Sequence, residues 1–551
     1  MTHAELADLM FPNVRQPIEY YLEKYGPRGL PADAVVTRYA PSPTGFIHMG
    51  ALYAAFVSRT FAKQTGGVFY LRIEDTDTKR TVENGIQLII DDLQKFGVVF
   101  DEGPVSETAE QGAYGPYIQT HRKEIYDAFV KHLVAQDKAY PCFCTPEELE
   151  AIRQKQEGEK EPIIGYWGKY AKCRSLTPGE AAARIQAGEP YIVRLKSQGD
   201  PAKKETFRDE IKGKLTVPEN CLDIVIMKGD GFPTYHFAHL VDDTLMRTTH
   251  VIRGDEWIAS LPIHLQLFRT FGFPLPHYAH IAPLMKNEDG GTRKLSKRKD
   301  PECAISYYFE IGMPTESILL YLATICNSDF EEWYTQNPDK EIGGFTFQFN
   351  KIGKAGAIYD LAKLYNISKG YISRLKAQDL YDRSLPFLQE YDPEFYKLYT
   401  RDEKYSVAAL NIDREKPKPR KDIAVYGDIK GQLWYLYDEL FGTPWEDASI
   451  IDTELLADYF VNVYDPADDA AAWMAKVKEF APKYGYAAET KEFKKNPEAY
   501  KGHFGAICGM LRYLVTAQTN SPDLYSILHL LGGDRVRARW QAYREWCARE
   551  K

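Results

Sequence analysis

The feature that most constrains the fold is a strand, a turn-rich loop, a helix and a second strand, all within the first hundred residues. Apolar Val35 and Val36 lead into a loop at residues 38–45, and a helix is expected to begin near Gly50. The second strand, expected at residues 68–73, ends in an acidic stretch. About thirty residues separate the two strands, which is the length of a right-handed βαβ unit. This pattern predicts an α/β fold built on a parallel sheet.

Length and composition indicate several packed domains. The chain has 551 residues, of which 44% are hydrophobic and 27% are charged, an ordinary globular composition. Its apolar runs are far shorter than the ~20 residues of a membrane-spanning helix, and the N-terminus lacks a signal-peptide pattern. We expect a soluble, cytoplasmic protein with no membrane partner. Because the net charge is −9, nucleic acid would have to be bound by local basic surface.

The pattern of apolar and polar residues changes along the chain. Residues 1–34 are predicted to form an N-terminal extension with one short helix, and residues 35–330 a sheet-centred domain. Within that domain, residues 140–222 mix short strands with a charged helix and indicate an inserted α+β subdomain. Residues 331–551 have few β-branched runs and are expected to be helical.

A histidine and a glycine lie at the predicted start of the first helix of the βαβ unit. His48 and Gly50 follow a Pro/Gly-rich turn. Unpaired backbone N–H groups at a helix start favour phosphate, and a residue without a side chain lets a nucleotide approach closely. The segment is therefore a candidate nucleotide site, the alternative being a turn with an exposed histidine.

A second candidate is the glycine-hinged loop at residues 290–299. Its last seven residues include five basic side chains, among them Lys294 and Lys297. Such a loop could close over a polyphosphate and stabilise the charge that shifts during transfer. It could instead be a solvated basic loop or a general nucleic-acid patch.

Together, these two segments resemble the signature sequences of class I aminoacyl-tRNA synthetases. His48-Met-Gly50-Ala51 resembles the first signature and Lys294-Leu-Ser-Lys297-Arg298 the second. Ala51 replaces a second histidine of the wider class, at a position that is commonly small in the glutamyl branch. The match narrows to the bacterial type of the glutamyl-tRNA synthetase family at residues 38–45, 72–77, 233–236 and 251–257. It covers residues 35–330 closely and continues more weakly through residues 353–360 and 521–535.

The resemblance implies a fold and an activity. The fold would be a Rossmann-type, doubly wound parallel-sheet catalytic domain with an inserted acceptor-binding subdomain, followed by an all-α linking and anticodon-binding region. The activity would be ATP-dependent ligation of L-glutamate to tRNA(Glu) through a glutamyl-adenylate, with transfer to the ribose of the 3′-terminal adenosine. ATP would be a substrate, Mg²⁺ a cofactor, and tRNA(Gln) a further candidate acceptor. The family also suggests a monomer.

The resemblance also implies the roles of individual residues. Catalysis is expected from His48 and Lys297, and ATP binding from His48, Gly50, Glu256, Lys294 and Lys297. The predicted glutamate pocket contains Arg38, Ala40, Ser42, Glu74, Tyr235 and Arg253. Arg38 and Tyr235 would hold the side-chain carboxylate, Arg253 the α-carboxylate and Glu74 the ammonium. The two arginines could exchange carboxylates, or each could form a structural ion pair, and Tyr235 could be a core aromatic.

Three cysteines form a candidate zinc site in the insertion. Cys142, Cys144 and Cys173 resemble the zinc-binding insertion of some family members. Tyr170 lies three residues before Cys173, whereas the family spacing is four, and no complete fourth ligand is evident. The alternative is three reduced thiols in a vestigial loop.

Alternatives for the whole chain remain open at this level. Anticodon recognition would use basic patches such as residues 414–421 or Arg535, Arg537 and Arg539, which could instead be solvated charge runs. A short paralogue that glutamylates a modified tRNA base would lack the helical tail, and a glutaminyl-tRNA synthetase would carry a β-barrel there. The alternative from another class is a catalytically inactive regulatory protein that binds tRNA or glutamate.

Overall fold

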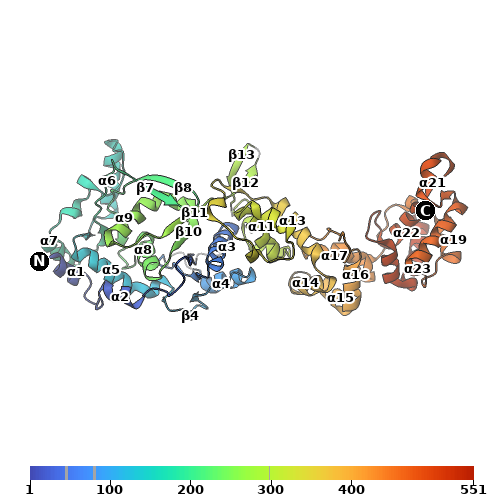
Figure 1. Ribbon diagram of the computed structural model, residues 1–551, viewed down its shortest axis with the longest axis horizontal. Helices are drawn as coiled ribbons and strands as arrows, with labels where there is room; N and C mark the ends of the chain where they lie inside the picture. Colours follow the sequence, from blue (N-terminus) through green and yellow to red (C-terminus); the bar gives the residue numbers. More distant parts are fainter. Residues whose placement is uncertain (44–46, 78–81, 289, 297, 551) are drawn as a thin grey trace. The chain divides into compact units, whose positions relative to one another are not determined.

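The computed structural model describes residues 1–43, 47–77, 82–288, 290–296 and 298–550. The chain divides into two compact units (Figure 1). The first contains Met1–Tyr307 and Leu319–Asp360, and the second contains Tyr308–Ile318 and the chain from Leu361 onward. The first unit therefore continues about thirty residues past the predicted end of the sheet-centred domain at residue 330, and the helix Thr315–Cys326 (α11) contributes to both units.

A parallel sheet lies at the centre of the first unit, which confirms the predicted fold class. Strand β1 (Val36–Tyr39) pairs with β2 (Val68–Leu71), and β10 (His250–Gly254) pairs with β11 (His277–Ile281), both in parallel. The amide of Thr249 donates to the carbonyl of Val36 at 3.0 Å and joins the two pairs. The strand order is therefore β2, β1, β10, β11, with the chain order reversing between β1 and β10.

Helix α3 (Met49–Gln64) follows β1 and packs on the sheet. Its buried face is apolar and includes Leu52, Ala55 and Phe56. The chain then turns at Gly66, whose φ of 65° favours glycine. A Cβ on Gly67 would lie 2.0 Å from the carbonyl oxygen of Val35. The two glycines thus allow β2 to begin directly beside β1.

The N-terminal segment folds onto the first unit. Helices α1 (His3–Met10) and α2 (Ile18–Lys24) pack against α5 (Lys123–Ala135). Only α2 was expected from the sequence. The missed signal for α1 is the capping box of Thr2 and Glu5, in which each side chain bonds the other residue's backbone amide.

The insertion contains strands and helices, as predicted. Strands β5 (Ala139–Cys142) and β6 (Ile192–Leu195) form an antiparallel sheet with β9 (Val225–Met227), which lies just past the predicted end of the insertion at residue 222. Helices α6 (Pro146–Gly158) and α7 (Pro178–Gln186) each begin with a capping box. A hairpin of β7 (Lys204–Asp209) and β8 (Gly213–Pro218) then returns to the central sheet, where the amide of Glu210 donates to Tyr278 on β11 at 2.9 Å.

The second unit is built mainly of helices. They include α13 (Leu361–Arg374), α14 (Ala377–Tyr391), α15 (Pro393–Arg401), α16 (Glu403–Asn411), α19 (Thr453–Asn462), α20 (Ala470–Phe480), α22 (Gly505–Thr516) and α23 (Leu524–Glu550). Helix α23 is kinked at Gly532. Two short strands, Tyr486–Ala487 (β15) and Gly502–His503 (β16), form a small parallel pair that the helical prediction did not include. Within the described ranges, each helix is too short or too polar to cross a bilayer.

Candidate active site

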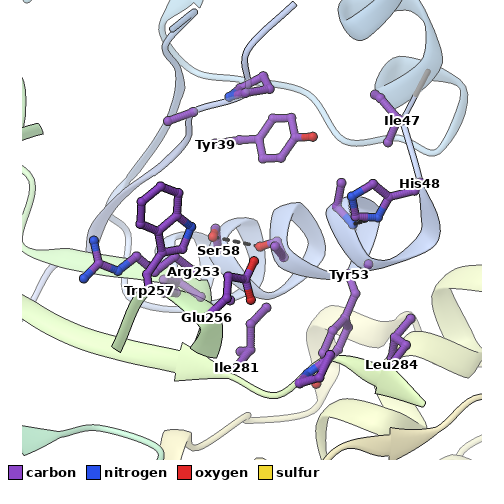
Figure 2. A pocket seen from close by; sticks show the side chains of 18 of the residues that line it. Tyr39, Ile47, His48, Tyr53, Ser58, Arg253, Glu256, Trp257, Ile281 and Leu284 are labelled. Atoms are coloured by element: carbon purple, nitrogen blue, oxygen red, sulfur yellow. Dashed lines mark hydrogen bonds between the residues drawn. The ribbon is translucent and has the colours of Figure 1, made fainter. Parts of the chain in front are cut away.

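A cavity of about 600 Å³ opens at the carboxyl ends of β1 and β10 (Figure 2). Ligands of doubly wound sheets bind where the strand order reverses, because loops diverge there and leave a crevice. Every predicted ATP or glutamate residue that the structure describes lines this cavity: Arg38, Ala40, Ser42, His48, Gly50, Glu74, Tyr235, Arg253, Glu256 and Lys294. Lys297 lies outside the described residues. Segments more than 200 residues apart in sequence thus meet at one crevice.

His48 is the N-cap of α3, and a backbone amide of that helix determines which ring nitrogen of His48 carries the proton. The Nδ1 atom accepts a hydrogen bond from the amide of Ala51 at 3.1 Å. A neutral ring in this arrangement carries its proton on Nε2, which is then a donor. A Cβ on Gly50 would lie 3.2 Å from His48 Nδ1 and would crowd the ring. The absence of a side chain at Gly50 therefore leaves room for the His48 ring and keeps the space beside the helix start open.

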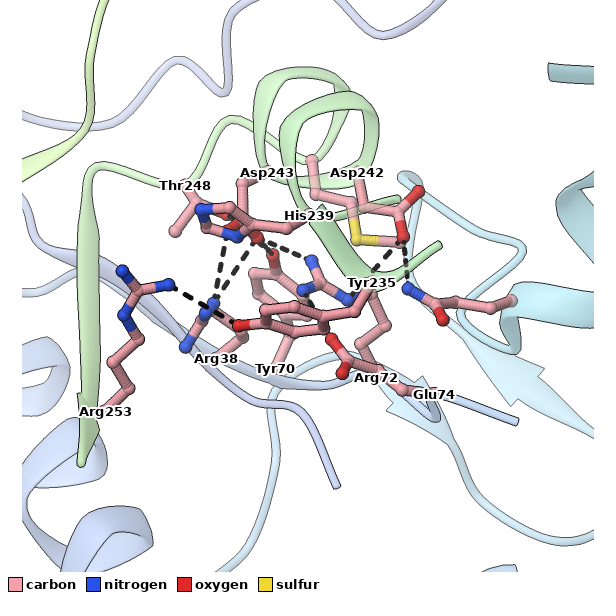
Figure 3. A network of polar contacts seen from close by, with 12 residues as sticks. Arg38, Tyr70, Arg72, Glu74, Tyr235, His239, Asp242, Asp243, Thr248 and Arg253 are labelled. Carbon is pink, nitrogen blue, oxygen red and sulfur yellow. Dashed lines mark hydrogen bonds and ion pairs between the residues drawn. The ribbon is translucent and has the colours of Figure 1, made fainter. Parts of the chain in front are cut away.

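Arg38 is held by a buried carboxylate beneath the cavity (Figure 3). Its Nε lies 3.4 Å from both oxygens of Asp243, and its Nη1 donates to the carbonyl of Ile252 at 3.3 Å. Arg72, which is fully buried, also donates to Asp243. Burial opposes ionisation of Asp243, but the charges of Arg72 and Arg38 hold its pKa well below the usual range. Arg38 is thus a preoriented cation with a fixed counter-ion.

Asp243 is a site residue that the sequence reasoning missed. It lies in helix α8 (Tyr235–Leu245), next to Asp242, which receives Arg122 Nε at 2.7 Å. The available signal was two adjacent acids within a helix whose other residues are largely apolar, since buried carboxylates need cationic partners.

Glu74 supplies a carboxylate at the cavity wall. Arg72 Nη2 donates to its Oε1 at 3.0 Å. Burial raises the pKa of Glu74, and the charges of Arg72 and Arg38 only partly offset that effect. The wall therefore offers a carboxylate that takes up a proton at a higher pH than an exposed glutamate does.

Tyr235 and Arg253 contact each other at the cavity wall. Arg253 Nη1 lies 3.5 Å from the Tyr235 hydroxyl (Figure 3). The rings of Tyr235 and Trp257 have centroids 4.2 Å apart. Both aromatic rings line the cavity, so neither is only a core residue. The cavity is thus lined by two arginines, Arg38 from β1 and Arg253 from β10, and by one acid, Glu74.

The segment 290–299, predicted to be a loop, begins with a strand: β13 (Gly291–Lys294) pairs antiparallel with β12 (Leu284–Glu288). Asp300, at the far side of the loop, accepts from Arg293 at 2.6 and 2.8 Å and from the amide of Ser296 at 2.9 Å. These hydrogen bonds, that of Arg293 most of all, lower the pKa of Asp300. The loop ends are therefore tied together, with Lys294 at the cavity wall.

The three predicted zinc ligands lie together in the insertion. The sulfur atoms of Cys142, Cys144 and Cys173 all lie within 4.8 Å of one another, and those of Cys144 and Cys173 are 3.7 Å apart. The hydroxyl of Tyr166 lies 3.3 Å from Cys144 Sγ. Tyr170, the tyrosine considered from the sequence, instead donates to Glu159 and Glu161.

The C-terminal arginines singled out from the sequence are bound to their own protein. Arg535 and Arg539 donate to Asp438, and Arg537 donates to the carbonyls of Phe460 and Tyr464. Arg414 is buried and donates to the carbonyls of Leu410 and Ile372. Arg414 and Arg539 are buried and therefore structural, whereas Arg537 is exposed and Arg535 is partly exposed. A basic patch that includes Arg535 and Arg537 stays a prediction.

Comparisons with known proteins agree with this arrangement. A family model described as "tRNA synthetases class I (E and Q), catalytic domain" matches residues 34–336, and one described as "Anticodon binding domain" matches residues 468–544. The fold and the cavity are therefore those of a class I tRNA synthetase.

The full-length relatives are more specific. The chain is 47% identical over 550 residues to glutamate–tRNA ligase of Clostridium perfringens strain SM101, covering 98% of this chain and 100% of the relative. It is 42% identical over 560 residues to that of Sorangium cellulosum, covering 96% and 97%. The crystal structure of glutamate–tRNA synthetase from Elizabethkingia anophelis has a TM-score of 0.74 at 27% identity, over 93% of this chain and 100% of that one. The chain belongs to the glutamate–tRNA ligase family.

Proposed function

We infer that the protein ligates L-glutamate to tRNA(Glu) in an ATP-dependent reaction that passes through a glutamyl-adenylate. The observation that carries this inference is the convergence of two arginines, one acid and the histidine of the helix start on one cavity. Glutamate has two carboxylates and one ammonium, so the charges of the cavity complement the substrate. The two arginines, the acid and the histidine are all among the described residues, and none of them favours an inactive binding protein.

Activation requires a glutamate carboxylate to attack the α-phosphate while pyrophosphate leaves. His48 would donate its Nε2 proton to a phosphate oxygen as negative charge develops there. Gly50 and Glu256 would contact the nucleotide, since both line the cavity. Lys294 and Lys297 would stabilise the leaving pyrophosphate, and Lys297 stays a prediction from the sequence.

The glutamate itself would lie between β1 and β10. Arg38 and Tyr235 would bind its side-chain carboxylate, Arg253 its α-carboxylate and Glu74 its ammonium, beside Ala40 and Ser42. An arginine can bond a carboxylate through two parallel N–H groups, which an amide does not match in charge. This difference would let the pocket reject glutamine.

Magnesium would come to the site with ATP. Among the described residues, the only three-member group of metal-ligand side chains is the cysteine cluster, so the cavity offers no carboxylate cage. Mg²⁺ commonly binds through substrate phosphates and keeps several waters. It would neutralise charge on the triphosphate.

Zinc would be held in the insertion by Cys142, Cys144 and Cys173. Zn–S bonds of 2.3 Å in a tetrahedron give S–S separations of about 3.8 Å, close to the 3.7 Å between Cys144 and Cys173. Tyr166 would be the fourth ligand because its hydroxyl contacts Cys144. Metal analysis of the purified protein and its Cys144→Ser variant tests this site: about one zinc per chain, lost in the variant, is expected.

We propose a role for each segment predicted from the sequence. Residues 35–330 would form the catalytic domain, and residues 140–222 within it would bind the tRNA acceptor end. Residues 331–551 would form the helical linking and anticodon-binding region. Residues 1–34 would stabilise α5. The enzyme would act as a monomer in the cytoplasm, with tRNA(Gln) as a second candidate acceptor.

Transfer of labelled glutamate to purified tRNA(Glu) and tRNA(Gln), with ATP and Mg²⁺, tests the function directly. Charging of tRNA(Glu) that collapses in Lys297→Ala and Arg253→Ala is expected, and the tRNA(Gln) reaction reports discrimination. A folded wild-type protein that charges neither tRNA would contradict the proposal.

A further inference from the structure

The guanidinium of Arg253 is surrounded by hydrogen-bond acceptors on its protein side. Its Nε donates to His280 Nε2 at 3.1 Å, and its Nη2 lies 3.2 Å from His264 Nδ1. The third contact is Nη1 to the Tyr235 hydroxyl. Because an arginine has only donors, the ring nitrogens that face it must be unprotonated. Both histidines must therefore be neutral and in one particular tautomer.

A buried carboxylate fixes that tautomer in His280. Asp209 Oδ2 lies 2.6 Å from His280 Nδ1, and both side chains are buried. The carboxylate keeps the ring proton on Nδ1 and leaves the Nε2 lone pair for Arg253. For His264 the corresponding partner is the ring of His236 rather than a carboxylate: His264 Nε2 lies 3.0 Å from His236 Nδ1.

Asp209 is itself anchored by backbone amides. It is the last residue of β7, and its Oδ1 accepts from the amides of Ile211 and Lys212 at 2.9 and 2.7 Å. The amide of His280 adds contacts of 3.2 and 3.3 Å. Burial opposes the charge of Asp209, but the hydrogen bonds from His280 and these amides lower its pKa overall. The carboxylate is thus a rigid, charged end of the chain of contacts.

We propose that Asp209 and His280 are positioning residues that orient Arg253 toward the α-carboxylate of glutamate. The proposal rests on the function proposed above. The three direct contacts of Arg253 are to neutral groups, so they set its direction without cancelling its charge. Arg38 differs, because Asp243 is an ionised partner in direct contact. The Asp209 charge reaches Arg253 only through the His280 ring.

A second acid–histidine pair, Glu210 and His277, lies close to Asp209 and His280 in the chain and is a matched control. Glu210 follows Asp209, and His277 begins β11, the strand of His280. His277 Nδ1 lies 2.9 Å from Glu210 Oε1, but the His277 side chain is 61% exposed. An acid–histidine contact of similar length therefore exists on the same elements outside the cavity. Its loss should leave glutamate binding unchanged.

The experiment is steady-state charging of tRNA(Glu), with KM measured separately for glutamate and ATP. His280→Phe removes the acceptor for Arg253 Nε, and we expect KM for glutamate to rise at least about tenfold while KM for ATP stays constant. His280→Gln can present an amide oxygen to Arg253 and should recover most of the loss. His277→Gln is the control and should match the wild type.

Asp209→Asn is a second, nearly isosteric test. The new amide would donate to His280 Nδ1 and move the ring proton to Nε2, where it would face the N–H of Arg253. A rise in KM for glutamate like that of His280→Phe is expected, with a melting temperature close to that of His280→Gln.

Three outcomes overturn the proposal: an unchanged KM for glutamate in both His280→Phe and Asp209→Asn, an equal rise in KM for glutamate and ATP, or no recovery in His280→Gln. The last two would mean that the pair only supports the fold. Failure of the wild type to charge tRNA(Glu) would instead contradict the proposed function, so the two failures can be distinguished.

Discussion

Buried arginines occur in both units of the molecule, and their surroundings differ. In the first unit, Arg38 and Arg253 are 4% and 6% exposed and line a cavity. In the second unit, Arg539 and Arg414 are 4% and 2% exposed. Arg414 donates to two carbonyls, and Arg539 donates to the carbonyl of Val515 and to Asp438.

The difference lies in what the guanidinium faces rather than in how deeply it is buried. The C-terminal pair satisfies backbone carbonyls, as buried donors must. Arg38 and Arg253 are also bonded to protein groups on one side, Arg38 to Asp243 and the carbonyl of Ile252, but both line a cavity on the other. A buried arginine is therefore evidence for a ligand site only when part of its fork lies along a cavity wall.

The largest expected effect comes from Arg253→Ala. Removing a cation that binds a substrate carboxylate should lower kcat/KM for glutamate by roughly a thousandfold, about 4 kcal/mol. Arg253→Lys should recover little, because lysine lacks the planar fork. Charging assays measure kcat/KM for glutamate, and a thermal melt measures the stability of each variant. Loss of folding with no specific loss of glutamate use would remove the contrast between the two units.

The reverse result is expected for Arg539→Met. Its loss leaves the carbonyl of Val515 unpaired in a buried place and should destabilise the second unit by about 2 kcal/mol. KM for glutamate should not change. Urea unfolding measures the first effect and charging of tRNA(Glu) the second. A rise in KM for glutamate would show that a carbonyl-bound arginine can still act on the pocket.

The acid of the pocket gives a pH test. Burial raises the pKa of Glu74, so protonation of this carboxylate begins at a higher pH than is usual for glutamate. Only the ionised form attracts the substrate ammonium. We expect kcat/KM for glutamate to fall about tenfold for each pH unit below that pKa. In Glu74→Gln this acid limb should disappear and activity should be low at every pH; an unchanged limb would assign the titration to another group.

The smallest effect is expected for Arg535→Ala. Arg535 donates to Asp438 and to the Tyr405 hydroxyl at a partly exposed place. Its loss should cost under about 1 kcal/mol, since Asp438 keeps Arg539. KM for tRNA(Glu) should be unchanged. A rise of tenfold or more in that KM would show that Arg535 contacts tRNA and that its role is not only structural.

Sequence reasoning was effective where the signal is local. The strand that ends at Tyr39, the helix that begins after His48 and the polar groups after the strand that ends at Gly254 could be predicted from local sequence patterns. The roles expected for individual residues such as Arg253 came from the resemblance to the family. The partners of the arginines were missed because Asp243 is 205 residues from Arg38, and His280 is 71 residues from Asp209. Tyr166 was missed for a similar reason, since loop geometry and not spacing brings its hydroxyl to Cys144.

The hairpin of β7 and β8 has a consequence for protein engineering. It follows β5, β6, α6 and α7 in the chain, yet the turn of the hairpin is bonded to β11 through Glu210 and Tyr278 and through Asp209 and His280. A minimal enzyme made by excising residues 140–222 would lose these bonds to the central sheet. A shortened catalytic core should therefore be cut before residue 204 and rejoined so that the hairpin remains.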